Sequence, residues 1–223
     1  MPLLELDALT FAWPGQPPCL DIGGFTLDAG EQVFLHGPSG SGKSTLLNLL
    51  AGVLKPGSGD VRLLGRSLPA LPGAVRDRLR ADHIGLIFQQ FNLIPYLSVL
   101  DNVRLPCRFS ARRRERAGEP GQAAQRLLGH LDLDAALWHR PATALSVGQQ
   151  QRVAAARALI GAPELVIADE PTSALDAERQ RAFLDLLADE CASAGAALVF
   201  VSHDRRLASR FTREVALAEI NRA

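Results

Sequence analysis

The glycine-rich stretch GPSGSGKST, Gly37–Thr45, constrains the fold of this chain more than any other feature. It follows the short apolar run Glu31–Gly37, which is typical of a buried strand. It precedes KSTLLNLLAGVL, a segment that we expect to form a helix ending near Pro56-Gly57. The apolar residues on one face of this helix would be Leu46, Leu49, Leu50 and Val53. A strand, a glycine loop and a helix in this order predict an α/β fold.

Three further short apolar runs predict strands of a mostly parallel core sheet. They are Ile84–Phe88, Glu164–Asp169 and Ala197–Val201. Each run is apolar throughout, as expected when both faces of a parallel sheet are covered. Near the N-terminus, LLELDALTFAWPG and FTLDAG are typical of a more exposed, antiparallel β subdomain.

Strand signals disappear between about residues 97 and 144. Segments rich in Arg, Leu and Ala fill this region and are broken at Pro106, Pro120-Gly121 and Pro141. We therefore predict an inserted α-helical subdomain at about residues 97–144. The rest of a single domain, 1–223, would be a core of about residues 1–96 and 145–223.

Composition limits the partners that this chain can have. Hydrophobic residues make up 47% of the 223 residues, enough for a sizeable core, and the formal net charge is zero. Without a global positive field we expect no nucleic-acid partner. The densest basic run, Arg108–Arg116, is usually a solvated helix face, with contact to nucleic acid or lipid headgroups as the alternative.

The three cysteines lie far apart and form no CxxC pair, which favours neither a disulfide framework nor a zinc site. The N-terminal sequence MPLLELDALTF does not have the pattern of a signal peptide. No apolar run approaches the roughly 18 residues that a membrane-spanning helix needs. We expect a soluble chain in a reducing cytoplasm that works at a membrane only through a partner.

The residue types of the glycine-rich stretch suit phosphate binding, since they fit the pattern G-x-x-x-x-G-K-[ST] between a strand and a helix. Glycines let the backbone N–H groups approach an anion, helped by the positive end of the following helix. Lys43 would face the outer phosphates, Ser44 would bind Mg²⁺ and Thr45 could reach the inner phosphate. The alternative is a Gly/Ser-rich turn that happens to contain a lysine. The residues of this loop are Gly37, Pro38, Ser39, Gly40, Ser41, Gly42, Lys43, Ser44 and Thr45.

Two acidic residues follow the apolar run ELVIADE. Asp169 ends the predicted strand, where it could hold magnesium through its water shell. Glu170 comes next and is the candidate to orient and deprotonate an attacking water. The alternative is a strand capped by two acidic residues before Pro171.

The stretch LSVGQQQR, Leu145–Arg152, is a second candidate anion site. Ser146 and Gln149 have the spacing of a capping box, which predicts the start of a helix. A well-capped core helix is the alternative. The stretch stands shortly before ELVIADEPTSALD, and this combination favours a functional role over that of a core helix alone.

With these motifs in this order, the chain resembles the ATPase subunit of ABC transporters over nearly its whole length. The resemblance implies a P-loop NTPase fold of the ABC ATPase type. Further residues take roles from the family: Trp13 stacks on adenine, Gln89 is the Q-loop glutamine, and His203 is the switch histidine that contacts the terminal phosphate. The signature motif would be Leu145, Ser146, Val147, Gly148 and Gln149, and the D-loop would be Ser173–Asp176, including Asp176.

The resemblance also implies ATP and Mg²⁺ as cofactors. Ser44, Gln89 and Asp169 would surround the metal, and Glu170 and His203 would be catalytic. Two subunits would pack head to tail as a homodimer or a pair of ABC ATPases, each signature motif capping the nucleotide of the other subunit.

The chain departs from the family pattern at two of these positions. Val147 stands where a glycine is usual. Since a β-branched residue resists positive φ, the backbone there must keep ordinary dihedrals. Trp13 replaces the commoner tyrosine and offers a larger stacking face.

A separate permease is implied, since the chain has no membrane span of its own. The stretch FQQFNLIPYLSVLDNVRLP would dock a short helix of that permease, unless Phe91, Leu93, Ile94 and Leu97 simply fill the subdomain core. This places the chain on the cytoplasmic side of the inner membrane.

The stretches ADEPTSALD and FNLIPYLSVLDNV are similar to the ATPases of the lipoprotein-release and macrolide-export group. This similarity implies export, extraction or mechanical transmission across the envelope. An amino-acid-type importer ATPase and a regulatory ABC ATPase outside transport are the alternatives. A non-hydrolysing structural subunit would be expected to lack Glu170 or His203, and a GTPase would need an N-K-x-D motif, which is absent.

Overall fold

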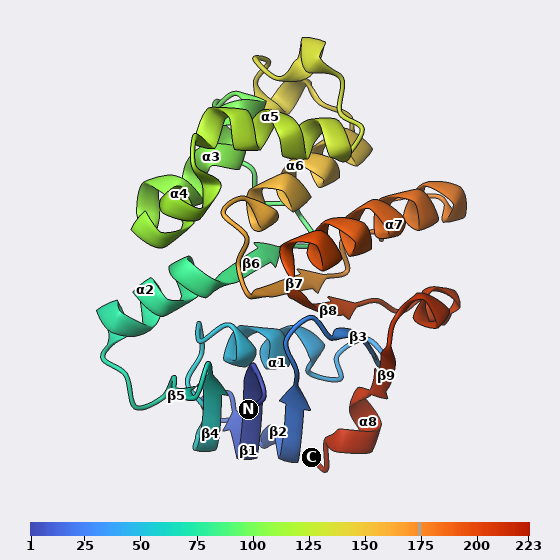
Figure 1. The fold of residues 1–223 in the computed structure, drawn as a ribbon. Helices are drawn as coiled ribbons and strands as arrows, with labels where there is room; N and C mark the ends of the chain where they lie inside the picture. The colour runs from blue at the N-terminus through green and yellow to red at the C-terminus, as the bar shows by residue number, and fades with distance from the viewer. Residues whose placement is uncertain (174) are drawn as a thin grey trace.

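A computed structural model describes residues 1–173 and 175–223, and it contains two sheets (Figure 1). The core sheet has the strand order β6-β7-β8-β3-β9, and all its pairings are parallel. This confirms the predicted parallel core, and β8 has the predicted bounds. The strands are β3 (Gln32–His36), β6 (Ile84–Ile87), β7 (Leu165–Asp169), β8 (Ala197–Val201) and β9 (Arg213–Ala216).

The second sheet is antiparallel and has the order β2-β1-β4-β5. It confirms the predicted N-terminal β subdomain. Its second strand begins at Pro18, earlier than the stretch FTLDAG indicated, because Leu20 and Ile22 pair with β1 and are buried. The strands are β1 (Leu4–Ala12), β2 (Pro18–Leu27), β4 (Ser58–Leu63) and β5 (Arg66–Ser67).

The helix α1 (Lys43–Leu50) follows the glycine loop and packs between the two sheets (Figure 1). It is shorter than predicted, and Val53 lies outside it with 49% of its surface exposed. The reason is Gly52, whose φ of 65° reverses the chain. The Gly52 N–H donates to Leu49 O and the Val53 N–H donates to Asn48 O, which is the Schellman pattern of a helix end.

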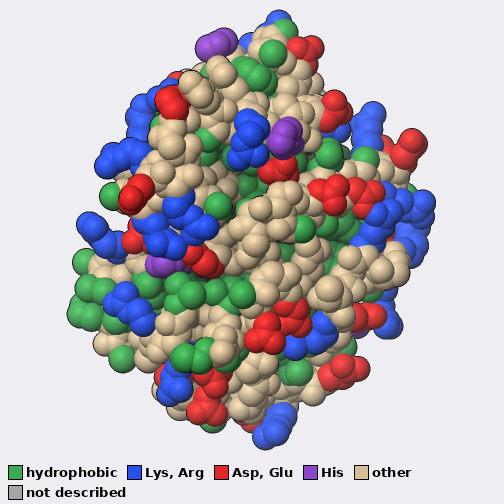
Figure 2. Space-filling model, in the orientation of Figure 1, with side chains coloured by type: hydrophobic (Ala, Val, Ile, Leu, Met, Phe, Trp, Pro, Cys, Tyr) green, Lys and Arg blue, Asp and Glu red, His purple; other side chains and the backbone are tan. Residues whose placement is uncertain are grey.

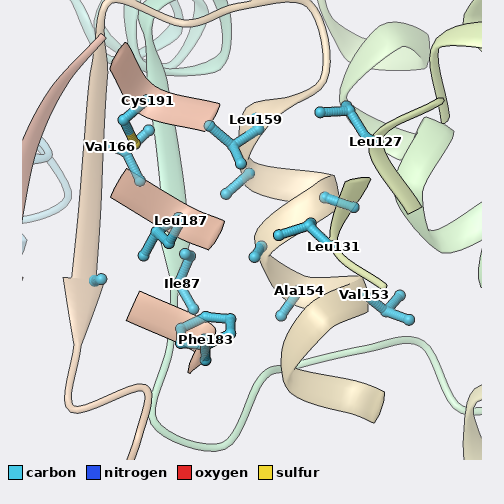
Figure 3. Close-up of a cluster of buried hydrophobic side chains, with 14 of the residues drawn as sticks. Ile87, Leu127, Leu131, Val153, Ala154, Leu159, Val166, Phe183, Leu187 and Cys191 are labelled. Atoms are coloured by element: carbon cyan, nitrogen blue, oxygen red, sulfur yellow. The ribbon is translucent and has the colours of Figure 1, made fainter. Parts of the chain in front are cut away.

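Both faces of the core sheet are covered, as the apolar runs predicted. Along β3, Val33 and Leu35 pack toward α1, and Phe34 packs on the opposite side with α6 (Val147–Leu159) and α7 (Ala177–Ala194). Figure 3 shows part of the packing on the α6 and α7 side of the sheet, where Phe183 and Leu187 of α7 lie close to Ile87 of β6. The core therefore holds the ends of β3 and β7, where the candidate site begins, in fixed register.

A helical region lies between β6 and α6, as predicted, and packs mainly on α6 (Figure 1). The prediction that proline breaks it at Pro106 is wrong, because this proline lies inside α3 near its C-terminal end. Pro120 starts a helix instead of ending one, since the first helical position needs no N–H donor. The helices are α3 (Val99–Phe109), α4 (Ala111–Ala117), α5 (Pro120–His130), and the short 3₁₀ turns Ala135–Leu137 and Ala142–Ala144.

The basic run on α4 is not a solvated face along its whole length, which corrects the prediction. Arg113 is only 3% exposed, and its guanidinium donates to the carbonyls of Ile160, Ala158 and Ile84. The guanidinium thus supplies donors to backbone carbonyls at the end of α6 and the start of β6, which would otherwise lack a side-chain donor. Burial lowers the pKa of Arg113 to about 10.

The remaining elements are α2 (Gly73–His83), the 3₁₀ helix Arg205–Arg210 and α8 (Leu217–Ile220). In the described part of the chain, no helix has the length and apolar character needed to cross a bilayer. Figure 2 shows basic and acidic side chains interspersed on one face of the molecule, in keeping with its net charge of zero.

Candidate nucleotide site

A hollow of about 440 Å³ brings together residues from four distant parts of the sequence. All but one of its lining residues are ones that the sequence predicted for the nucleotide and its metal. The exception is Cys19, which no sequence motif indicated. The lining residues are Trp13, Cys19, Ser39, Gly40, Gly42, Lys43, Ser44, Thr45, Gln89, Asp169 and Glu170.

The glycine loop has the backbone geometry that anion binding requires. Gly40 and Gly42 have φ values of 77° and 97°, which side-chain-bearing residues rarely adopt. Gly42 is also the N-cap of α1, so the positive end of this helix lies at the hollow, which Gly42, Lys43 and Ser44 line. Gly37 is needed for space, since a Cβ there would lie 2.9 Å from Ser41 Oγ.

Lys43 is held in place by the loop itself. Its side chain is largely buried, and Nζ donates to the carbonyls of Gly37 and Pro38, both at 2.8 Å. These contacts fix the ammonium at the wall of the hollow, where a polyphosphate would meet a point charge.

Asp169 is the last residue of β7, and its carboxylate lines the same hollow as Ser44 and Gln89. Burial raises the pKa of Asp169, and the charge of Glu170 raises it further, whereas Ser44 and Lys43 oppose the shift. Hydroxyl, amide and carboxylate oxygens are donors that suit Mg²⁺. Within residues 1–173 and 175–223, no group of three His, Cys, Asp or Glu side chains could hold a metal alone. The donor set therefore fits an ion shared with phosphate oxygens.

Glu170 has an unusual backbone conformation, with a φ of 44°. Its N–H donates to Val201 O on β8 at 3.0 Å, and its Oε2 lies 3.2 Å from Nδ1 of His203. The two proposed catalytic side chains thus meet from two neighbouring strands. A non-glycine residue in the left-handed region costs about 1–3 kcal/mol, which the surrounding contacts must offset.

The aromatic and glutamine residues expected from the family both line the hollow. Trp13 follows β1, is 46% exposed and makes an edge contact with Phe11 at 5.2 Å between ring centroids. Gln89 follows β6. Beyond it, Phe91 and Asn92 also have positive φ.

Arg157 of α6 donates to the carbonyls of both Phe91 and Asn92 and so holds the turn that follows Gln89. The motifs did not indicate this arginine. Only its place in the helix that begins at the second anion site could have suggested a role.

The stretch LSVGQ forms the predicted helix start. The Ser146 N–H donates to Gln149 Oε1 at 2.9 Å, and the Gln149 N–H donates to Ser146 Oγ at 3.4 Å, which is a complete capping box. Val147 keeps an ordinary φ, as predicted, and is 47% exposed. Leu145 is buried and anchors the motif in the core.

The helix start lines a second hollow of about 480 Å³, which contains residues Ser146 to Gln149. This hollow shares no lining residue with the one around the glycine loop. Within one chain, the two candidate anion sites are therefore separate.

The predicted D-loop, Ser173–Asp176, is described except for Ala174, which lies outside the described residues. Asp176 caps α7 by accepting a hydrogen bond from the Arg179 N–H at 3.0 Å.

Comparison with known proteins defines the class of this chain. A family model described as "ABC transporter" matches residues 20–173. The chain belongs to this family, as its motif order predicted, and is an ATP-binding ATPase subunit with the α/β fold of that family.

Relatives support the predicted group within the family. The chain is 42% identical to the lipoprotein-releasing system ATP-binding protein LolD of Anaeromyxobacter dehalogenans, over 98% of this chain and 91% of LolD. It is 41% identical to the macrolide export ATP-binding/permease protein MacB of Rhodopseudomonas palustris over 87% of this chain. It is 38% identical to SyfD of Pseudomonas syringae, a probable syringafactin export protein, over 97% of this chain. It spans only 29% of MacB and 33% of SyfD, which are fused ATP-binding and permease proteins by name.

Among solved structures, the chain is similar to MJ0796, described as a bacterial ABC transporter cassette. The dimeric structure of MJ0796 matches with a TM-score of 0.86 and 35% identity, over 96% of this chain and 93% of that one. A second dimeric structure, a post-hydrolysis state with ADP and Pi, matches with a TM-score of 0.83.

Proposed function

We propose that this chain hydrolyses ATP in a head-to-tail dimer and thereby drives a separate membrane permease. The observation that carries the proposal is the separation of the two hollows. One hollow contains the glycine loop and the other contains the signature residues, so the two candidate phosphate-binding motifs do not meet within one chain. The dimeric structures of MJ0796, a cassette with a similar fold, support a paired arrangement.

Within the nucleotide hollow, the chain's own residues divide the work. The glycine loop and Lys43 bind the phosphates, and Trp13 stacks on the adenine. Ser44, Asp169 and Gln89 would hold Mg²⁺, which supplies positive charge between the phosphates when bound. Glu170 orients and deprotonates the attacking water, and His203 contacts the terminal phosphate.

Glu170 and His203 support each other in this scheme. Because their side chains lie within hydrogen-bonding distance, the imidazole orients the carboxylate toward the hollow. Glu170 is held at the backbone by Val201, so the carboxylate does not need to reorganise before reaction.

The signature residues complete the neighbouring subunit's site. The capped N-terminus of α6 presents Ser146 Oγ and the Gly148 N–H toward solvent in its own chain. In the dimer these donors would meet the terminal phosphate bound by the partner, so ATP joins the two subunits. Hydrolysis removes the shared phosphate and loosens the interface.

A groove of about 330 Å³ between α2, β6 and α3 is the proposed docking surface for the permease. Its apolar lining includes Leu86, Phe88 and Phe109. Phe109 is 75% exposed. Tyr96, in the segment between β6 and α3, is 80% exposed. The patch suggested by sequence is only partly available, since Phe91 is buried and Leu93 packs against the core.

The relatives favour export or lipoprotein release as the work of the assembly, with the chain bound at the cytoplasmic face of the inner membrane through its permease. An amino-acid-type importer remains the second candidate from the sequence. Co-purification of the tagged chain with its permease would test the docking surface. The wild-type chain should retain the permease, and a Tyr96→Asp/Phe109→Asp variant should lose it while keeping ATP binding.

Steady-state hydrolysis tests the dimer. At low protein concentration the rate should rise with the square of concentration and become linear once dimers dominate. A rate proportional to concentration at dilutions where the chain is monomeric would show that one chain acts alone and would overturn the proposal.

A further inference from the structure

Gln180, in the first turn of α7, touches the loop that carries Glu170. Its Nε2 donates to the carbonyls of Thr172 and Leu175, both at 3.1 Å. We propose that Gln180 is a positioning residue that holds Glu170 in its catalytic conformation. The inference rests on the proposed role of Glu170 as the residue that activates water.

The orientation of the Gln180 amide follows from its partners. Both neighbours are carbonyl oxygens, so only the NH₂ group can face them. Turning the amide over would place three oxygen atoms together. The other amide atom, Oε1, is buried and has no partner in the described part of the chain. The amide therefore keeps this orientation although its oxygen accepts no hydrogen bond from the described residues. This indicates that the two bonds to the loop determine the orientation.

These two bonds stabilise a turn that the backbone alone holds weakly. Glu170 has left-handed φ and is followed by Pro171, which offers no N–H to the turn. The Ser173 N–H reaches Glu170 O at 3.3 Å, a long contact, and the Leu175 N–H donates to Thr172 O at 3.0 Å.

Thr172 is 1% exposed, so its carbonyl has no access to water as a substitute donor. Gln180 thus ties the buried part of the loop to a long helix. On the other side, Val201 accepts from the Glu170 N–H. Loss of the Gln180 donors would leave the loop attached on the β8 side only, through Val201 and His203, and the carboxylate would sample positions away from the attacking water.

Two variants of the full chain test the inference. Gln180→Met keeps the length of the side chain and removes its donors, and Gln180→Glu keeps the shape and replaces the donors with oxygen. Both should lower kcat by about tenfold or more, because small misplacement of a catalytic group has large effects. The KM for ATP should change less than twofold, since the nucleotide hollow does not include this residue.

Arg181→Met is the matched control, because Arg181 is the exposed neighbour of Gln180 on the same helix. It should keep the wild-type kcat. If the Gln180 variants keep wild-type kcat, or if they lose folding or ATP binding together with activity, the positioning role is wrong. Failure of the underlying assignment is distinguishable, because Glu170→Gln would then retain activity whatever stands at position 180.

Discussion

Nδ1 of His203 lies 3.2 Å from Oε2 of Glu170, although the two residues are 33 positions apart in the chain. They are brought together because β7 and β8 are parallel neighbours, and each residue follows the C-terminal end of its strand. The pair joins the residue that we propose activates water to the residue that we propose contacts phosphate.

His203→Ala should therefore lower kcat by about 100-fold, the usual scale for removing a donor aimed at developing charge. ATP affinity should change little, because the glycine loop, Lys43 and Trp13 supply most of the proposed contacts to the nucleotide. Steady-state kinetics and calorimetry separate the two effects. His139→Ala is the control, since His139 is exposed in another part of the chain and should leave both quantities unchanged. Wild-type kcat in His203→Ala would remove the catalytic role of the pair.

Asp169→Asn should stabilise the nucleotide-free chain and abolish hydrolysis. Burial and the charge of Glu170 raise the pKa of Asp169, so the folded chain binds this proton more tightly than the unfolded chain does. When the pH is above the ordinary pKa, the charged carboxylate therefore lowers the free energy of unfolding. This destabilisation decreases as the pH falls and the carboxylate is protonated. At pH 7 we therefore expect Asp169→Asn to have a higher Tm than the wild type.

Thermal unfolding at several pH values checks this expectation. The advantage of Asp169→Asn should shrink as the pH is lowered and Asp169 itself becomes protonated. A lower Tm than wild type at pH 7 would show that the charge of Lys43 outweighs burial at this site.

Glu164 should make the stability of the fold depend on acid. Burial alone would raise its pKa, but hydrogen bonds and charges from His83 and Arg112 lower it to about 2. A lowered pKa contributes stability that is complete above the ordinary value of 4.5 and is lost as pH falls toward 2. Glu164→Gln should lower the free energy of unfolding by about 1 kcal/mol at pH 7, after allowance for solvent screening.

Urea unfolding between pH 7 and pH 2 measures this contribution. Wild type should lose more stability than Glu164→Gln between pH 4.5 and pH 2. Glu115→Gln, an exposed position on α4, should follow the wild-type curve. Parallel curves for wild type and Glu164→Gln would contradict the assignment.

Arg113→Met should destabilise the chain strongly. The change leaves the carbonyls of Ile160, Ala158 and Ile84 without their side-chain donor in a buried place. The expected cost is about 3 kcal/mol, which should lower Tm by roughly 6–12 °C. Arg114→Met, at the exposed neighbouring position, should have almost no effect. Equal Tm values for the two variants would mean that the guanidinium contributes no net stability.

The contrast between Arg113 and Lys43 shows what sequence alone can predict. The residues from Gly37 to Thr45 form one continuous segment that ends in the first turn of α1, so their spacing predicts their geometry. Asp169 and Glu170 follow a run of apolar residues that can only be a buried strand. These parts of the site were predictable because local pattern determines them.

Other residues take their roles from contacts across the fold. Arg113 looks like one member of a basic run until the structure places core carbonyls around it. Gln180 acts through two carbonyls earlier in the chain, and Cys19 enters the hollow through the pairing of β1 with β2. The spacing of residues in the sequence does not predict contacts of this kind. The early end of α1 has a similar cause, since Gly52 closes the helix through its backbone conformation.

Complementation between two inactive variants tests most directly whether each subunit completes the other's site. Lys43→Ala removes phosphate binding, and Gly148→Asp places a negative charge at the start of α6. Each should be inactive alone. Mixed in equal amounts, they should recover up to about a quarter of the wild-type rate, because half the dimers are mixed and each has one intact composite site. Recovered hydrolysis supports the shared site, whereas a mixture as inactive as its components, at concentrations where wild type is dimeric, would contradict it.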